Sequence, residues 1–306
     1  MRTKMKKQMI NRILIPIDFS ETGLLALEHG AFMARLFKAD LYILHIVEVM
    51  DFAYSEYDPI IIRPNYQEIE KIASTKLNKL AKKISQQNKI HVTPLLDSGR
   101  VISGITSAAK DNNIDVIIMG THGAKGFDEF FIGSNAHKTV TVSPCPVITV
   151  QTHSKKLGFN NIVLPIDNTV HSRQKVDLVI ELASKYDAKI HILGLINTNE
   201  EIEEKKFNIK IDAVEKAVKK ANLAYERKIV KAENLAIEAM KYSKKIKADL
   251  IVIMTDHESN LTGMFLGGFA EQIINHSSIP IMSIKPLEGI YEGLDLRGIA
   301  NPINEI

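Results

Sequence analysis

The sequence predicts an α/β protein built from two tandem, doubly wound domains, and an internal repeat is the main reason. ILIPID at 13–18 recurs as IVLPID at 162–167, and CPVITV at 145–150 recurs as IPIMSI at 279–284. Self-similarity over such a long period marks repeated folding units. The chain has 306 residues, more than the roughly 100–200 residues of a usual single domain. We therefore expect one domain over 10–151, a second over 160–286 and a C-terminal tail over 287–306.

The first copy alternates short apolar runs with amphipathic stretches. Apolar residues at helical spacing over 24–34 and 69–84 predict helices, and Ser20 is the expected N-cap of the first of them. The runs between the helices are continuous rather than alternating, which is typical of strands buried on both faces of a parallel sheet. Alternation of such strands with helices indicates βαβ units and a doubly wound sheet. The five expected strands are Ile13–Ile17, Leu41–Val47, Ile90–Leu96, Val116–Met119 and Val147–Val150.

The second copy follows the same plan, with helices expected around 176–183 and 214–221. It is shorter than the first, and the loss falls between its second and third strands. The polar stretch QTHSKKLGF at 151–159 is the expected linker between the copies.

Composition excludes several classes of protein. Net charge is +3, from 39 basic and 36 acidic residues, which is too balanced to require a nucleic-acid or membrane partner. Cys145 is the single cysteine, so an internal disulfide framework and a cysteine-built zinc site are excluded. No apolar run approaches the roughly 20 residues that span a bilayer. The basic start MRTKMKKQM lacks an apolar core after it, so we expect a solvated tail and a cytoplasmic protein.

Glycines follow the fourth strand of the first copy, where a doubly wound sheet binds its ligands. The loop begins with Gly120 and Gly123, and Gly133 and Ser134 stand just before a helical pattern. Glycines allow a close backbone approach to phosphate, and the amides at a helix start favour an anion. Asp18, after the first strand, can accept hydrogen bonds from a ribose or a base. A loop that merely turns the chain is the alternative, and the residues alone leave both open.

The spacing Gly120-x2-Gly123-x9-Gly133-Ser134 resembles the ATP-binding signature of the universal stress protein family. ILIPIDFSE and LHIVE resemble the first two strands of that family, and the resemblance covers nearly the whole chain as a tandem. It implies domains with a five-stranded, mainly parallel sheet of the Rossmann-like, adenine nucleotide alpha hydrolase-like type, often assembled as dimers.

The resemblance also implies an ATP site, with Mg²⁺ as a further candidate. The adenine and ribose side would comprise Pro16, Ile17, Asp18, Ile46 and Met119. The phosphate side would comprise Gly120, Gly123, Gly133, Ser134 and the backbone of Asn135. His122 and Lys125 are additional phosphate candidates, and a solvent-facing loop position is the alternative for each.

The second copy departs from the signature. Met254 and His257 stand where the first copy has its first two glycines, and Gly267-Gly268 stands in place of Gly-Ser. A Met side chain would crowd the backbone approach to phosphate. Asp167 is kept as the counterpart of Asp18. We therefore expect the second copy not to bind ATP in the usual way.

Other polar residues are interpreted structurally. Cys145 and His45 are expected to pack. Polar residues 256–258 are expected in a loop, since the pattern lacks a second metal-ligating His at helical spacing. Residues 200–206 are expected on a solvated helix or loop face. Tyr54, Tyr57 and Tyr66 are expected in a loop after the second strand.

These observations favour an ATP-binding protein of stress response or signalling over an enzyme, because no catalytic constellation stands out. A scaffold that binds a protein partner through edge strands or loops is the alternative, and an ATP-using transferase is a third. Neither a metal site, a nucleic acid nor a membrane is expected. Family members commonly pair their last strands between subunits. We therefore expect the strands at 147–150 and 281–284 to pair antiparallel within the chain, as a pseudo-dimer, with a homodimer as a further expectation.

Overall fold

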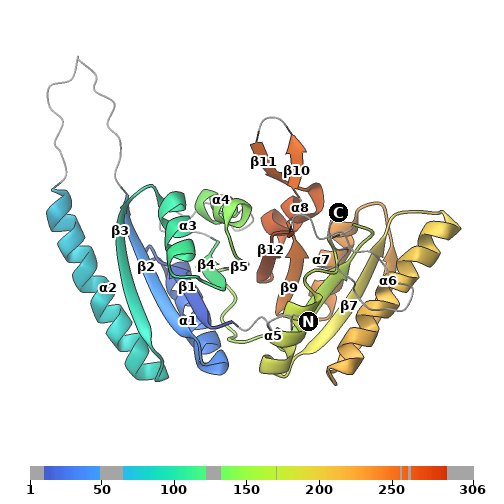
Figure 1. Cartoon of the computed structure of the whole chain (residues 1–306), viewed down its shortest axis with the longest axis horizontal. Coiled ribbons are helices and arrows are strands. Elements are labelled where there is room, and N and C mark those ends of the chain that lie inside the picture. The colour runs from blue at the N-terminus through green and yellow to red at the C-terminus, as the bar shows by residue number, and fades with distance from the viewer. Residues whose placement is uncertain are drawn as a thin grey trace, which may run out of the picture.

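The computed structural model describes residues 10–48, 65–121, 132–169, 171–255, 257–260 and 263–287, with only the backbone for 257–260 and 263–265. The two copies share one ten-stranded sheet (Figure 1). In the first copy the strands are β1 (Arg12–Pro16), β2 (Asp40–Glu48), β3 (Val92–Gly99), β4 (Val116–Gly120) and β5 (Val147–Val150). In the second they are β6 (Asn161–Ile166), β7 (Lys189–Ile196), β8 (Tyr225–Lys231), β9 (Leu250–Met254) and β12 (Ile281–Ile284).

The strand order is β3-β2-β1-β4-β5-β12-β9-β6-β7-β8. Each half is parallel, with its first strand between its second and fourth strands. The halves meet where β5 and β12 pair antiparallel, with Ile148 opposite Met282. Both residues are fully buried. The expected antiparallel pairing of the two final strands within one chain is thereby confirmed, and each strand covers the edge that the other would expose.

Helices cover both faces of the sheet. One core layer packs under α1 (Glu21–Phe37), α2 (Tyr66–Asn88), α5 (Val176–Tyr186) and α6 (Glu201–Lys220). The other packs under α3 (Val101–Asp111), α4 (Ser134–Val142), α7 (Leu235–Lys245) and α8 (Gly268–His276). The doubly wound α/β prediction is confirmed. Within the described residues, no helix is both long enough and apolar enough to cross a membrane.

The first helices of the two copies differ in length, and the residue at the neighbouring strand end differs too. Ser20 caps α1 by accepting a hydrogen bond from the Gly23 amide at 3.0 Å, as expected. The first turn of α1 lies so close to β4 that a Cβ on Gly120 would come within 2.8 Å of Thr22 Cγ2 and 3.0 Å of the Thr22 carbonyl. In the second copy Met254 takes the place of Gly120, and α5 begins only at Val176.

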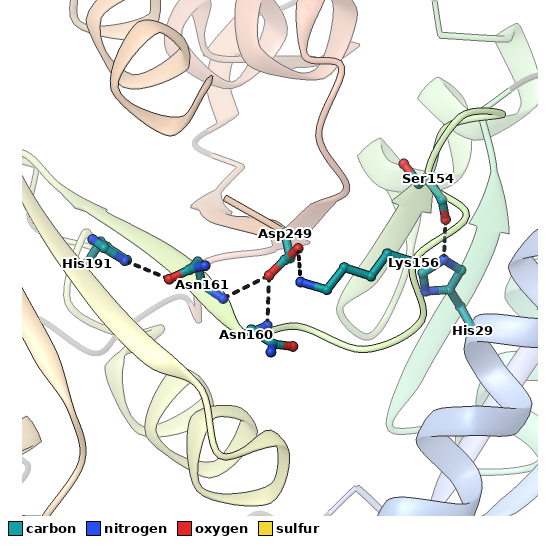
Figure 2. A network of polar contacts seen from close by, with 7 residues as sticks. All are labelled: His29, Ser154, Lys156, Asn160, Asn161, His191 and Asp249. Atoms are coloured by element: carbon teal, nitrogen blue, oxygen red, sulfur yellow. Dashed lines mark hydrogen bonds and ion pairs between the residues drawn. The ribbon is translucent and has the colours of Figure 1, made fainter. Parts of the chain in front are cut away.

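The linker forms polar contacts with both copies at the edge of the sheet where the strands begin (Figure 2). His29 on α1 is hydrogen bonded through Nε2 to the Ser154 carbonyl at 2.8 Å. Lys156 forms an ion pair with Asp249 at 2.8 Å. Asp249 also accepts hydrogen bonds from the amides of Asn160 and Asn161, both at 2.9 Å. These contacts fix where β6 begins relative to the first copy.

Two local predictions were wrong. Tyr66 begins α2 rather than lying in a loop, while Tyr54 and Tyr57 fall outside the described residues. The segment around 257–260 is a strand, β10 (His257–Asn260), which pairs antiparallel with β11 (Gly263–Leu266) as a separate two-stranded sheet. Figure 1 shows this hairpin beyond the strand ends, near α4 and α8. In the repeat, the sequence of this hairpin corresponds to the glycine loop of the first copy.

Candidate functional site

The candidate site lies at the carboxyl ends of β1 and β4. These strands are neighbours, and the chain winds from β1 toward β2 on one side and from β4 toward β5 on the other. Such a reversal of strand order is where open α/β sheets bind ligands. The structure therefore brings together the two segments that the sequence analysis assigned to ligand binding.

Asp18 follows β1 and is exposed. Its Oδ1 accepts hydrogen bonds from the amide of Ser20 at 3.0 Å and from the Ser20 hydroxyl at 2.6 Å. Asp167 makes the same contacts with Thr169 in the second copy, at 2.9 and 2.6 Å. This turn is thus a structural feature of both copies, and it holds the Asp18 carboxylate at the edge of the site.

The backbone amide and carbonyl of Ile17 both have partners within the fold. Its side chain is buried in the core, its amide donates to the Leu44 carbonyl at 2.8 Å, and its carbonyl contacts His45 Nδ1 at 2.7 Å. His45 is thus a hydrogen-bonded, half-buried histidine, as expected. Met119 is buried in the opposite core layer, while Pro16 and Ile46 are half-buried beside the strand ends.

The glycine loop is only partly described. Its second glycine, Gly123, and the candidates His122 and Lys125 lie outside the described residues. Its two ends are tied together, since the Gly133 amide donates to the Thr121 carbonyl at 2.6 Å. Gly120 has a structural role in the approach of α1, as described above, in addition to the ligand role implied by the signature.

Helix α4 begins at the site without a side-chain cap. Its N-cap is Gly133, and Ser134 and Asn135 in its first turn are exposed. The first turn has no acidic residue, whereas the first turn of α8 carries Glu271. Because a helix start carries partial positive charge, α4 is the better anion site of this pseudo-symmetric pair.

Helices α4 and α8 contact each other across the boundary between the two copies. His137 on α4 lies at the position equivalent to Glu271 on α8, and its Nε2 is 2.9 Å from Glu271 Oε2 and 3.2 Å from Oε1. This contact fixes α4 against the second copy. The sequence analysis missed it, because neither residue belongs to a motif.

A further acidic residue near the site also went unnoticed. Asp97 is exposed near the carboxyl end of β3, and a Cβ on Gly104 of α3 would lie 3.1 Å from Asp97 Oδ2 and 2.7 Å from Ile46 Cδ1. The only available signal was the position of Asp97 at a strand end. The carboxyl edge thus presents two carboxylates beside apolar side chains, and a helix start with exposed amides and a hydroxyl group.

The remaining candidates behave as structural residues. Burial raises the pKa of the Cys145 thiol to about 11, in agreement with the expected packing role. Among the described residues, no group of three His, Cys, Asp or Glu side chains is placed to hold a metal ion.

The fold and the site together define a tandem protein of two doubly wound α/β units. The chain belongs to the universal stress protein family, because the sequence model of that family matches residues 9–151 and again 158–285.

Individual relatives resemble one copy or both. Universal stress protein YxiE of Bacillus subtilis is 27% identical over 149 residues, which is 47% of this chain and 100% of the relative. Universal stress protein MJ0531 of Methanocaldococcus jannaschii is 30% identical over 152 residues, which is 49% of this chain and 87% of the relative. The crystal structure of a universal stress protein from Archaeoglobus fulgidus superposes with a TM-score of 0.72 at 18% identity, covering 92% of this chain and 98% of that one. This last likeness concerns the fold, and it extends over both copies.

Proposed function

We propose that this protein binds ATP in its first copy and acts in stress response or signalling without a dedicated catalytic activity. The observation that carries the proposal is the start of α4, which has no side-chain cap and carries the Gly133-Ser134 end of the glycine-rich signature. The exposed first-turn amides and the Ser134 hydroxyl suit phosphate oxygens. Asp18, with its carboxylate held by Ser20, suits a ribose hydroxyl, and Ile46 and Pro16 suit the base.

The second copy serves mainly as a structural partner in this proposal. Met254 replaces the first glycine, the β10–β11 hairpin corresponds in sequence to the loop, and Glu271 opposes an anion at the start of α8. Such a copy still covers β5 with β12 and still holds α4 through the His137–Glu271 contact. Mg²⁺ would accompany the phosphates, and a cytoplasmic location and a homodimer remain predictions.

The sharpest test places a carboxylate at the start of α4. Ser134→Asp should stabilise the helix by about 0.3–1 kcal/mol through its dipole, while it repels the phosphates. Calorimetric titration with ATP and Mg²⁺ should therefore show at least a tenfold loss of affinity in a protein that melts no earlier than the wild type.

Gly268→Asp is the matched control, because Gly268 occupies the equivalent position of α8 and a Cβ there would meet nothing within 4 Å. ATP affinity should be unchanged in this variant. Equal ATP binding by wild type and Ser134→Asp would contradict the proposal and favour a scaffold that uses its surface to bind a protein partner.

A further inference from the structure

A groove away from the candidate nucleotide site lies between α1 and α2, on the helical layer, and one linker residue closes it. Its cavity measures about 290 Å³, at the small end of the roughly 300–1,000 Å³ typical of ligand sites. α1 contributes Leu24, Leu27, Glu28, Ala31, Phe32 and Arg35, at the spacing of a single helix face. α2 contributes Leu80, Lys83, Ile84, Gln87 and Asn88, and the linker contributes Leu157.

The floor of this groove is apolar and partly open to solvent. Ala31 and Ile84 are buried, while Leu24 and Leu157 keep 39% and 37% of their surface exposed. Exposed leucines on the two sides of one hollow favour an apolar occupant, because covering them removes apolar surface from water.

The rim carries an excess of positive charge. Arg35 and Lys83 are exposed cations, and Glu28 is the one carboxylate on the lining. Arg35 lies over the Phe32 ring, with its guanidinium carbon 5.2 Å from the ring centroid. Among the described residues neither cation forms an ion pair, so both are available to an anionic group.

The residues that line this groove differ between the two copies. Ile180 occupies in α5 the position of Ala31 in α1, and Glu181 occupies the position of Phe32. The floor residue is thus larger in the second copy, and an acidic residue stands in place of an aromatic one.

We infer that this groove binds a small amphipathic anion, an aliphatic carboxylate of medium chain length, with its chain along Leu24 and Leu157 and its carboxylate at Arg35 and Lys83. The cavity volume of about 290 Å³ favours a small molecule, because small-molecule sites are concave cavities of roughly this size. The net positive rim argues against a cationic amphiphile. Through Leu157 the ligand would contact the linker that joins the copies.

The test is calorimetric titration of the full chain with decanoate below its micelle concentration, with decyltrimethylammonium as the probe of opposite charge. One saturable decanoate site per chain is expected, with the cation bound at least tenfold more weakly. Lys83→Glu should weaken decanoate binding about three- to tenfold, as expected for a partly exposed charge contact. Leu24→Ser, a truncation of a part-exposed side chain, should weaken it as well.

Lys82→Glu is the matched control, because Lys82 is the exposed neighbour of Lys83 on α2 and does not line the groove. Equal effects of the Lys82 and Lys83 changes, no saturable decanoate binding, or equal binding of the two probes would each overturn the inference. Ser134→Asp should leave decanoate binding intact, so failure of the nucleotide proposal and failure of this inference are distinguishable.

Discussion

At the scale of single residues, the repeat separates structural side chains from candidate ligand-binding ones. Asp115 accepts hydrogen bonds from the amides of Asn11 and Arg12 at 2.7 and 2.9 Å, and Asp249 does the same for Asn160 and Asn161. Both copies keep this pair, so it serves the fold. Ser134 has no such counterpart, because the second copy has glycine there. Residues that differ between the copies are therefore the clearest ones to test for function, whereas Asp18, which both copies keep, also serves the turn.

The lowered pKa of Glu215 provides a test of how charged hydrogen bonds contribute to the stability of the protein. Hydrogen bonds from Lys219, Arg227 and Tyr225 lower its pKa to about 2, from an ordinary value of 4.5. Because the pKa is lower in the folded state, the stabilisation is fully present above about pH 4.5. It is lost as the pH falls toward 2.

Glu215→Gln should therefore lower the urea midpoint at pH 7, and the gap to the wild type should narrow steadily between pH 5 and pH 3. Glu201→Gln is the control on the same helix, since Glu201 is 81% exposed and contacts only Lys205 among the described residues. A gap that stays constant over this pH range would show that Glu215 acts through packing and not through charge.

At the scale of elements, the strands and helices of each copy could be predicted from apolar periodicity, because each run is long enough to bury a face. The β10–β11 hairpin could not be predicted, since its sequence lacks the alternation of apolar and polar residues that marks a hairpin. The start of α5 could be predicted, because a helix was expected around 176–183 and α5 spans Val176–Tyr186.

The close approach of α1 and β4 leads to a stability prediction. Gly120→Ala places a methyl group against the backbone of Thr22, which cannot move as a side chain tip could. Unfolding should become easier by about 1–3 kcal/mol, the usual cost of overpacking. Gly268→Ala, with open space around its Cβ, is the control and should leave stability equal or slightly higher. An unchanged denaturant midpoint for Gly120→Ala would show that α1 shifts freely and that the glycine serves only the ligand.

At the scale of the whole molecule, the continuous sheet explains why a copy without the glycine signature is retained. β12 hydrogen bonds to β5, and His137 contacts Glu271 across the boundary, so the second copy supports the helix that begins the candidate phosphate site. The strand pairing could be predicted from the repeat, because two final strands with unpaired edges lay on one chain. The His137–Glu271 contact could not be predicted, since the sequence does not indicate which faces of α4 and α8 meet.

The asymmetry between the copies is the central claim, and the number of nucleotides bound per chain tests it most directly. Native mass spectrometry of the wild-type protein with excess ATP and Mg²⁺ should show one ATP for each 306-residue chain, and no second occupancy as the nucleotide concentration is raised through saturation. Two ATP molecules per chain, or none, would contradict the account.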